Sequence, residues 1–309
     1  MSRALVWAFG LFLTAGLLLT GCTRPSAAPK PKPAAITDSA YLTADLWNDG
    51  RAEVAFYQVR RTQDQYGRPN EQRFLVGTYL VKHRFSPSQM TKVTDGSSGT
   101  SAFKYALFYE LESGSYQYKR NWVVNARQEN LRPFKQSFTS FDWCSNQYRE
   151  LAFTPDGPIE VRMRSDDYGN RRTSFAVKAH SYPPAQLPML VRSLDFSETD
   201  TVSFNVAVAE EGKHVSARAV RGGVERVETE AGSYPAERVT VTYDTAVPSP
   251  IGEESAQTEI YWRGTGSERL LLKMRAQNER YRMTLVEQLR TPYWKENLWP
   301  KLDRVEGRP

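Results

Sequence analysis

Residues 102–122 read AFKYALFYELESGSYQYKRNW, and apolar side chains recur at every second position of this stretch. One side carries the large apolar residues Phe103, Tyr105, Leu107, Tyr109 and Leu111. Successive side chains of a β-strand point to opposite faces, so this period of two predicts a strand with one buried face. A Ser-Gly-Ser triplet interrupts the pattern at 113–115, and Tyr116, Tyr118 and Trp122 resume it. The stretch therefore predicts a β-hairpin with an aromatic inner face.

The same period continues through most of the chain after residue 50. We expect further strands at Ala52–Arg60, Arg73–Arg84, Phe134–Trp143, Tyr148–Phe153, Thr173–Ala179, Thr201–Ala209, His214–Val220, Val224–Glu230, Tyr234–Tyr243, Thr258–Arg263, Arg269–Arg275 and Arg280–Leu289. Glycine adopts positive φ without steric cost, so Arg221-Gly222-Gly223 and Ala231-Gly232-Ser233 are predicted to be tight hairpin corners. Helical spacing is confined to Pro184–Asp195 and Ser39–Trp47, which predict one or two short helices. The fold class is all-β and mainly antiparallel.

The N-terminus has the features of an export signal and is excluded from the fold. Arg3 precedes an apolar run, Ala4 to Leu19, that is shorter than the roughly 20 residues needed to span a bilayer. Leu19-Thr20-Gly21-Cys22 follows at once and resembles the lipobox of bacterial lipoproteins. The resemblance implies cleavage between Gly21 and Cys22 and a diacylglycerol on the Cys22 thiol, with a further acyl chain such as palmitate on the new amine. An uncleaved membrane anchor is the alternative.

Four parts follow from this interpretation. They are a signal peptide at 1–21, a Pro/Ala/Lys tether at 22–36, a β-rich body at 37–295 and an irregular tail at 296–309, with a subdivision of the body conceivable near 155–200. Membrane lipid is the expected partner of Cys22, and the body is expected in the cell envelope, facing the periplasm or the exterior. Thr23 after the lipidated residue resembles the default for the outer membrane, if the host has two membranes.

Composition limits the remaining partners. Lysine and arginine number 41 against 35 aspartates and glutamates, a formal charge of +6 that is not gathered into the basic stripe of a nucleic-acid-binding protein. No nucleic acid partner is therefore expected. Lipidation of Cys22 leaves Cys144 as the one thiol of the mature chain, which predicts a buried cysteine and no intrachain disulfide. A reactive or intermolecular thiol is the alternative for Cys144.

Catalytic and metal-binding signatures are weak. His83, His180 and His214 lie in separate predicted strand regions without a second ligand at metal spacing, so no metal site, catalytic residue or cofactor is predicted. Asp166-Asp167 lacks the alternating oxygen ligands of a calcium loop and is predicted to form a solvated turn. Glu253-Glu254, or Glu228 with Glu230, could serve a glycosidase only if folding brought them to the required separation.

Three short segments resemble a large family of β-rich periplasmic proteins and lipoproteins. They are Ala185-Gln-Leu-Pro-Met-Leu-Val-Arg-Ser-Leu-Asp195, Val227-Glu-Thr-Glu-Ala-Gly-Ser-Tyr-Pro-Ala-Glu-Arg-Val239, and Ile260-Tyr-Trp262 with Leu270-Leu-Leu-Lys273. The resemblance covers roughly Phe103 to Leu289. It implies a long, strongly curved antiparallel sheet, like an open or flattened barrel, and it brings no established activity and no catalytic residues.

The aromatic alternation suggests one further site. Tyr105, Tyr109, Tyr118 and Trp122 are candidates for a face that binds an apolar ligand, because the inner side of a strongly curved sheet can line a pocket. A filled core is the alternative explanation for such a face. The functional hypothesis is a membrane-anchored, non-enzymatic protein that binds or carries an apolar ligand or an envelope partner. An envelope-polymer hydrolase would instead gather titratable groups in a cleft, and a structural scaffold would have a filled interior.

Overall fold

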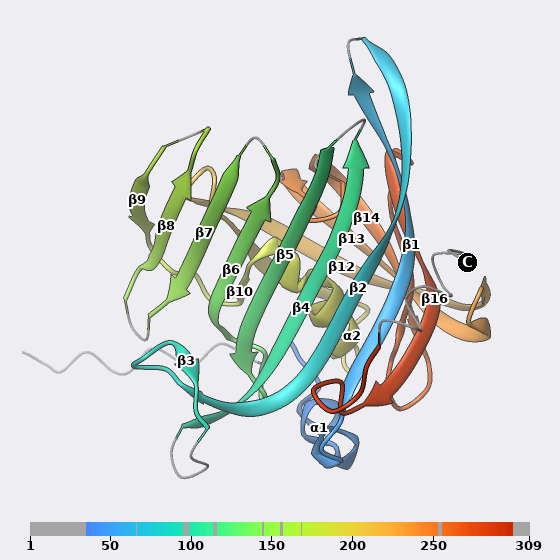
Figure 1. Cartoon of the computed structure of the whole chain (residues 1–309). Helices are drawn as coiled ribbons and strands as arrows, with labels where there is room; N and C mark the ends of the chain where they lie inside the picture. The colour runs from blue at the N-terminus through green and yellow to red at the C-terminus, as the bar shows by residue number, and fades with distance from the viewer. Residues whose placement is uncertain are drawn as a thin grey trace, which may run out of the picture. The chain divides into compact units, whose positions relative to one another are not determined.

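Strands dominate the part of the chain that the structure describes, which is residues 35–298 without 66, 95–98, 114–115, 144, 155–156, 168 and 253–254. In this computed structural model, sixteen strands form one sheet that is open and not closed into a barrel (Figure 1). All neighbours pair antiparallel except β10 and β11, which pair in parallel through Ser181 and Asn205. The predicted all-β fold, with a strongly curved antiparallel sheet and short helices, is confirmed.

The strands are β1 (Ala52–Gln65), β2 (Arg68–Ser86), β3 (Thr91–Lys92), β4 (Thr100–Ser113), β5 (Tyr116–Arg127), β6 (Pro133–Phe141), β7 (Asn146–Phe153), β8 (Ile159–Ser165), β9 (Arg171–Phe175), β10 (Ser181–Tyr182), β11 (Thr201–Val208), β12 (Lys213–Thr229), β13 (Gly232–Pro248), β14 (Ser255–Gly264), β15 (Leu271–Ala276) and β16 (Tyr281–Thr291). The helices are α1 (Ser39–Thr43), η1 (Asp45–Asn48), η2 (Pro184–Gln186) and α2 (Leu187–Ser193). Both predicted helical regions are therefore helical.

Chain order and sheet order differ at one junction. The sheet runs β10 to β16 in sequence, then β1, β2 and β4 to β9, with β3 beside β2. Strand β1 joins the two series because it pairs with β16 on one side and β2 on the other. The sheet thus begins at β10 and ends at β9, two strands that lie in the middle of the chain.

The predicted hairpin at 102–122 is confirmed as β4–β5, with Leu107 opposite Trp122. The predicted strands at 214–220 and 224–230 are instead one continuous strand, and the expected corner at Gly222-Gly223 was wrong. Pairing skips there from Arg221–Val239 to Val224–Glu237, so two glycines oppose the single residue Arg238 in a β-bulge. A Cβ on Gly222 would lie 3.1 Å from Arg238 Nε, which explains a glycine at this position.

Strand β8 was not predicted, although Ile159, Val161 and Met163 alternate there with charged residues. The predicted corner near Gly232 is confirmed, because Thr229 pairs with Gly232 across a two-residue turn and Gly232 has φ +133°. The turn predicted at Asp166-Asp167 lies between β8 and β9. Gly21, Cys22, Cys144, Glu253 and Glu254 lie outside the described residues, as do Tyr66 and Tyr168.

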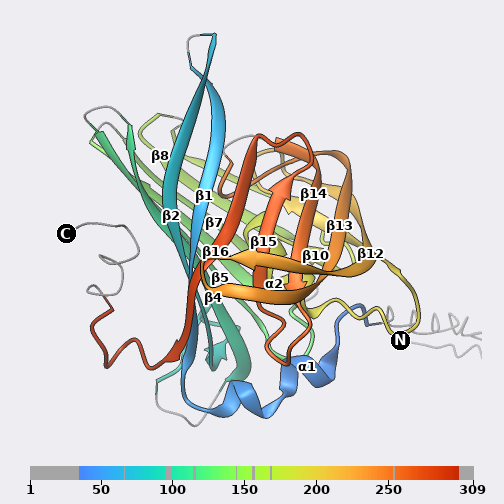
Figure 2. The same cartoon turned by 90° about the vertical axis from the view of Figure 1, so that its right-hand side faces the viewer.

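Helix α2 lies inside the curve of the sheet (Figures 1 and 2). Leu187, Leu190 and Val191 are at most 3% exposed and belong to one large core cluster with side chains from both series of strands. Pro188 stands in the first turn, where its missing N–H costs no hydrogen bond. Buried Gln186 donates to the carbonyl of Leu131 at 2.6 Å and so ties the helix entrance to the β5–β6 loop.

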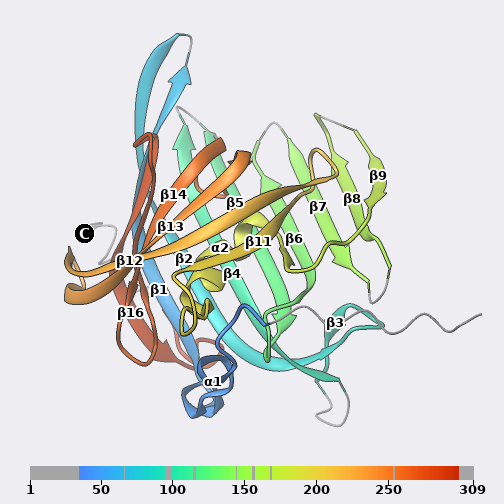
Figure 3. The same ribbon diagram turned by 180° about the vertical axis from the view of Figure 1, so that it is seen from behind.

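The two ends of the sheet lie face to face. Seen from behind, β11 and β12 cross the strands β5 to β7 (Figure 3). Leu151 and Val161, of β7 and β8, share a small buried cluster with Ala207 and Ala209, at the end of β11. Side-chain packing therefore holds these layers together where no hydrogen-bonded ladder joins them among the described residues.

Candidate functional site

A cavity of about 710 Å³ lies between these two layers. Its floor is the concave face of β5 to β9, a region (Tyr116–Phe175) that we call the arm. Its roof is the turn between β11 and β12, Ala207–Gly212, and its sides are η2 and the segment Pro248–Pro250. The volume falls within the range typical of small-molecule sites. The cavity is the candidate binding site of the protein.

Aromatic rings cross the strands in a row that leads into the cavity. Phe74 lies 4.8 Å from Tyr109, Tyr109 lies 5.8 Å from Trp122, and Trp122 lies 4.6 Å from Phe138, measured between ring centroids. Adjacent rings at such distances attract each other beyond the area they bury. Trp122 and Phe138 line the cavity, whereas Phe74 and Tyr109 are buried in the core beside it.

The four residues of the predicted apolar face are thus divided by the structure. Trp122 lines the cavity, and Tyr109 stacks on it from the core side. Tyr105 is 5% exposed within the core, and Tyr118 is half-buried against the same core. The prediction missed Phe138, Val161 and Met163, whose alternation along β6 and β8 was the available signal.

Polar side chains replace apolar ones at many inner positions of the arm. The polar floor residues are Arg120, Gln136, Gln147, Arg149, Arg171 and Thr173. Gln136 is 4% exposed and Ser249 is 7% exposed, yet Gln136 Oε1 and Ser249 Oγ have no hydrogen-bond partner among the described residues. A buried polar atom without a partner is unfavourable. These two atoms are therefore available to a molecule in the cavity.

Arg149 links floor and roof. Its terminal nitrogen forms an ion pair with Glu210, and its guanidinium lies 5.0 Å from the centroid of Phe138. Burial lowers the pKa of Arg149, and the neighbouring Glu210 carboxylate opposes that shift. Only 13% of the Arg149 side chain is exposed, against 41% of that of Glu210. The cation thus belongs to the cavity wall and the carboxylate to its rim.

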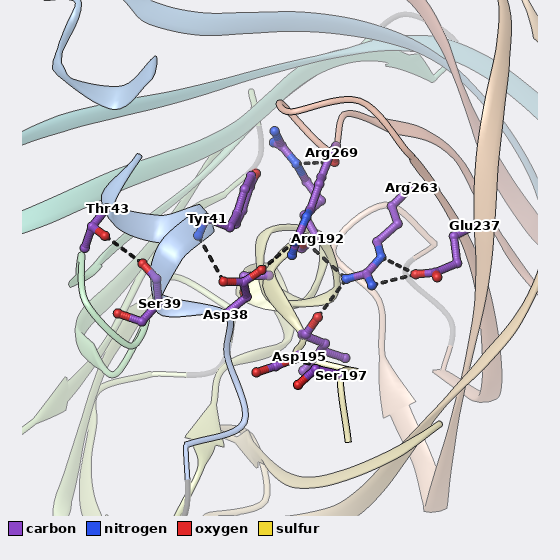
Figure 4. A network of polar contacts seen from close by, with 12 residues as sticks. Asp38, Ser39, Tyr41, Thr43, Arg192, Asp195, Ser197, Glu237, Arg263 and Arg269 are labelled. Atoms are coloured by element: carbon purple, nitrogen blue, oxygen red, sulfur yellow. Dashed lines mark hydrogen bonds and ion pairs between the residues drawn. The ribbon is translucent and has the colours of Figure 1, made fainter. Parts of the chain in front are cut away.

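A second group of charges surrounds the end of α2 (Figure 4). Arg192 binds Glu53 through two hydrogen bonds of 2.7 Å, and it also donates to the carbonyls of Glu268 and Arg269. Arg263 bonds Glu237 and donates to the carbonyls of Val191 and Leu194, where a cation complements the negative end of a helix.

The ions of this second group have close partners. Arg269 pairs with Asp38 at 2.5 Å, which fixes the residues before α1 against the same region. A shallow polar pocket of about 330 Å³ remains between Arg221, Arg263 and Arg269. Because its three arginines each bind a carboxylate, we assign this network to the packing of α2 and not to ligand binding.

A third polar cluster is fully enclosed. Tyr243 and Tyr281 each donate to the carboxylate of Glu259 at 2.5 Å, and Tyr261 donates to it at 2.6 Å. Burial raises the pKa of Tyr243 and of Tyr261 well above the usual value, and the Glu259 charge adds to the shift. The small gap beside this cluster is about 10 Å³, so the hydroxyls serve the carboxylate and no ligand.

Catalytic arrangements are not apparent in the described residues. His83 lies 3.1 Å from the Asn125 side chain, and burial lowers its pKa to about 4. His214 lies against the Phe175 ring, and His180 lies in the loop before β10. The described lining of the cavity contains no histidine. Glu228 accepts a hydrogen bond from Ser233 at the tip of β12–β13, outside the cavity.

Two further observations concern the described residues alone. They contain no group of three or more His, Cys, Asp or Glu side chains that could hold a metal ion. None of their helices has the length and apolar character that crossing a membrane would require.

No family model matches the sequence, and no characterised protein matches it either. Among solved structures, the chain resembles a beta-barrel-like protein of the domain of unknown function DUF1849 from Brucella abortus, with 8% identity and a TM-score of 0.50. That match covers 77% of this chain and 97% of the other. It shows a shared fold and nothing about activity.

A second match, to a protein of YmcC-like fold from Bacteroides fragilis whose name describes it as exported, has 8% identity over 77% of this chain and 95% of the other. Its TM-score of 0.21 does not indicate a common architecture.

Proposed function

We propose that the protein binds an apolar or amphiphilic molecule in the cavity of the arm and has no catalytic role of its own. One observation carries the proposal: about 710 Å³ of space is lined on its floor by Trp122, Phe138, Val161 and Met163. A pocket with an apolar wall and a few placed polar groups is the usual form of a small-molecule site. A scaffold with a filled interior would have no reason to keep this space.

The lipobox at 19–22 supports the place of action. Lipidated Cys22 anchors the body outside the cytoplasm, in the outer membrane if the host has two membranes, and the Pro/Lys tether holds the cavity near the bilayer. Membrane lipids and their breakdown products are the apolar molecules most abundant at that place. The proposed role is therefore to hold or carry a lipid-like molecule in the cell envelope.

An envelope-polymer hydrolase is the second candidate, and the residues favour it less. Hydrolysis by side chains needs a nucleophile or carboxylate with a positioned partner. Ser249 and Glu210 line the cavity, but Glu210 is bound to Arg149, and Ser249 Oγ has no hydrogen bond to a base among the described residues.

Native mass spectrometry tests the proposal. The body beginning at Ala35, secreted into its own host envelope and purified without detergent, should carry an added mass of lipid size. Met163→Trp places a larger side chain in the cavity, so this variant should lack the added mass. Arg164→Trp, on the opposite face of β8, should retain it. A clean protein mass from the body and from Arg164→Trp would contradict the proposal.

A further inference from the structure

We propose that the cavity selects amphiphiles with one anionic head group, and that this group competes with Glu210 for Arg149. The inference rests on the proposed function, because it names the class of ligand that the same cavity accepts. It assigns the apolar chain to the aromatic floor and the head group, a carboxylate or a phosphate, to the arginines.

The charges of the wall point to an anion. Arg120, Arg149 and Arg171 reach the cavity from β5, β7 and β9, so every second strand of the arm contributes one cation. Two acids, Glu210 and Glu211, stand against them. Three guanidinium groups thus face two carboxylates, and the formal charge of the wall is +1. A surplus of one sign in a recess raises the local concentration of ligands of the other sign.

Arg149 has a donor that Glu210 does not use. Its terminal nitrogen binds Glu210, while its buried Nε–H has no partner among the described residues. A guanidinium presents Nε–H and a terminal N–H in parallel to one carboxylate or phosphate, which gives the strongest form of this contact. An anion on the inner side of Arg149 would satisfy this donor. Because the same guanidinium would then hold two anions that repel each other, the incoming anion competes with Glu210.

The position of Glu210 allows an incoming anion to displace it from Arg149. It stands in the roof turn that ends at Gly212, which has φ +60°, and 41% of its side chain is exposed. Its carboxylate can therefore return to water without crossing an apolar layer. Partly exposed ion pairs contribute little net stability, so their exchange costs little. Release of Glu210 also removes the one ion pair that joins roof and floor among the described residues.

The unpartnered atoms in the cavity fit a head group near these arginines. Gln136 and Ser249 line the same space as Arg149, and the pairing of β6 with β7 puts Phe138 directly opposite Arg149. A chain lying on Phe138 and Trp122 would thus have its polar end beside the guanidinium.

Probe displacement tests the selection. The body beginning at Ala35 is one compact unit that contains all sixteen strands and the described core residues. The fluorescent probe 1-aminoanthracene, which is uncharged, is first bound to the body. The affinities of dodecanoate, dodecan-1-ol and dodecyltrimethylammonium are then measured by how well each displaces the probe. We expect dodecanoate to bind about tenfold or more tightly than the alcohol, the gain of a charge-assisted hydrogen bond, and the cation to bind most weakly.

Variants separate the roles. Arg149→Gln should reduce the acid-to-alcohol ratio to about threefold or less, and Glu210→Gln should raise the ratio because the competitor is gone. Arg162→Gln, on the outer face of β8, is the control and should keep the ratio. Glu210→Gln changes an exposed turn residue, so it remains informative if Arg149→Gln fails to fold.

Equal binding of acid and alcohol would overturn this inference and leave the proposed function standing. Preferential binding of the cation would overturn it as well. Failure of all three compounds to displace the probe, or failure of the probe itself to bind, would count against the proposed function.

Discussion

Two regions of one curved sheet differ in what covers their concave face: a packed core in one and a cavity in the other. We call the region around α2, with β1 and β12 to β16, the filled half. Its concave face is covered by a helix, and side chains such as Leu190 and Met283 are 0% exposed. In the arm, the same face is covered by the roof turn, η2 and the segment Pro248–Pro250, and a cavity of about 710 Å³ remains. Curvature alone therefore does not determine whether a sheet encloses a core or a site; the covering element does.

Buried polar groups differ between the two regions in part, since Gln186 Oε1 before α2 and Thr291 Oγ1 in β16 also lack hydrogen-bond partners among the described residues. In the filled half, the buried ions Arg192 and Glu53 have several short hydrogen bonds, and Glu259 has three hydroxyl donors. Beside the cavity, Gln136 Oε1 of the arm and Ser249 Oγ of the segment Pro248–Pro250 are buried without partners among the described residues. Satisfied polar groups specify a packed interior, whereas unsatisfied ones beside a cavity indicate where a ligand makes contacts.

The largest expected effect is in the filled half. Arg192→Met leaves Glu53 charged and buried, and the free energy of unfolding should fall by about 3–5 kcal/mol. Arg221→Met breaks the exposed pair with Asp200 and should cost about 1 kcal/mol or less. Urea unfolding measures both. A loss below about 1 kcal/mol for Arg192→Met would contradict the view that the Arg192–Glu53 pair holds the packed interior of the filled half together.

Truncation of an apolar side chain sharpens the comparison. Leu190→Ala opens a void under α2 and should cost about 2–5 kcal/mol. Met163→Ala, in the half-buried floor of the cavity, removes atoms that already face space and should cost about 1 kcal/mol or less. The affinity for dodecan-1-ol should fall in Met163→Ala and stay unchanged in a Leu190→Ala protein that remains folded. Similar losses of stability in the two variants would mean that the arm is packed like the filled half.

Gly252 lies at the border between the two regions. A Cβ at this position would lie 2.5 Å from Cδ1 of Tyr281, a ring that is held by Glu259. Gly252→Ala should therefore cost about 1–3 kcal/mol through overpacking. Gly223→Ala, with no atom within 4 Å of its new Cβ, is the control. Thermal unfolding of the two variants side by side would show whether the border is as tight as the geometry requires.

The smallest effect concerns pH. His214 of β12 contacts the Phe175 ring of β9 at 5.1 Å, so it joins roof-side and floor-side strands of the arm. Burial, followed by the Lys178 charge, lowers its pKa below the usual 6.5. The unfolded chain then binds the proton first, so stability is full above about pH 6.5 and declines as pH falls below it. Because the ring is half-exposed, solvent screening limits the loss to about half a kcal/mol or less.

Amide hydrogen exchange, measured strand by strand as a function of pH, tests this effect. Amides of β9 should exchange faster as the pH falls below 6.5, after correction for intrinsic rates, and amides of β15 should not. In His214→Gln the two strands should show the same pH dependence.

The sequence predicted what local patterns determine. Alternation identified the β4–β5 hairpin, and Pro188 with its apolar neighbours identified α2. Gly222-Gly223 was misread as a corner because a bulge and a corner use the same residues, and only the register of β13 distinguishes them. The lining of the cavity beyond Trp122 was not predictable, because residues such as Arg149 and Glu210 are 61 positions apart and meet only through the curve of the sheet.

The most direct test of the account is a crystal structure of the body beginning at Ala35, grown with dodecanoate. The account predicts the chain of dodecanoate along Trp122, Phe138 and Met163, its carboxylate on Arg149, and Glu210 turned into solvent. It also predicts an unchanged interior around α2. An arm whose floor and roof meet without space between them, or dodecanoate bound elsewhere with the Arg149–Glu210 pair intact, would contradict it.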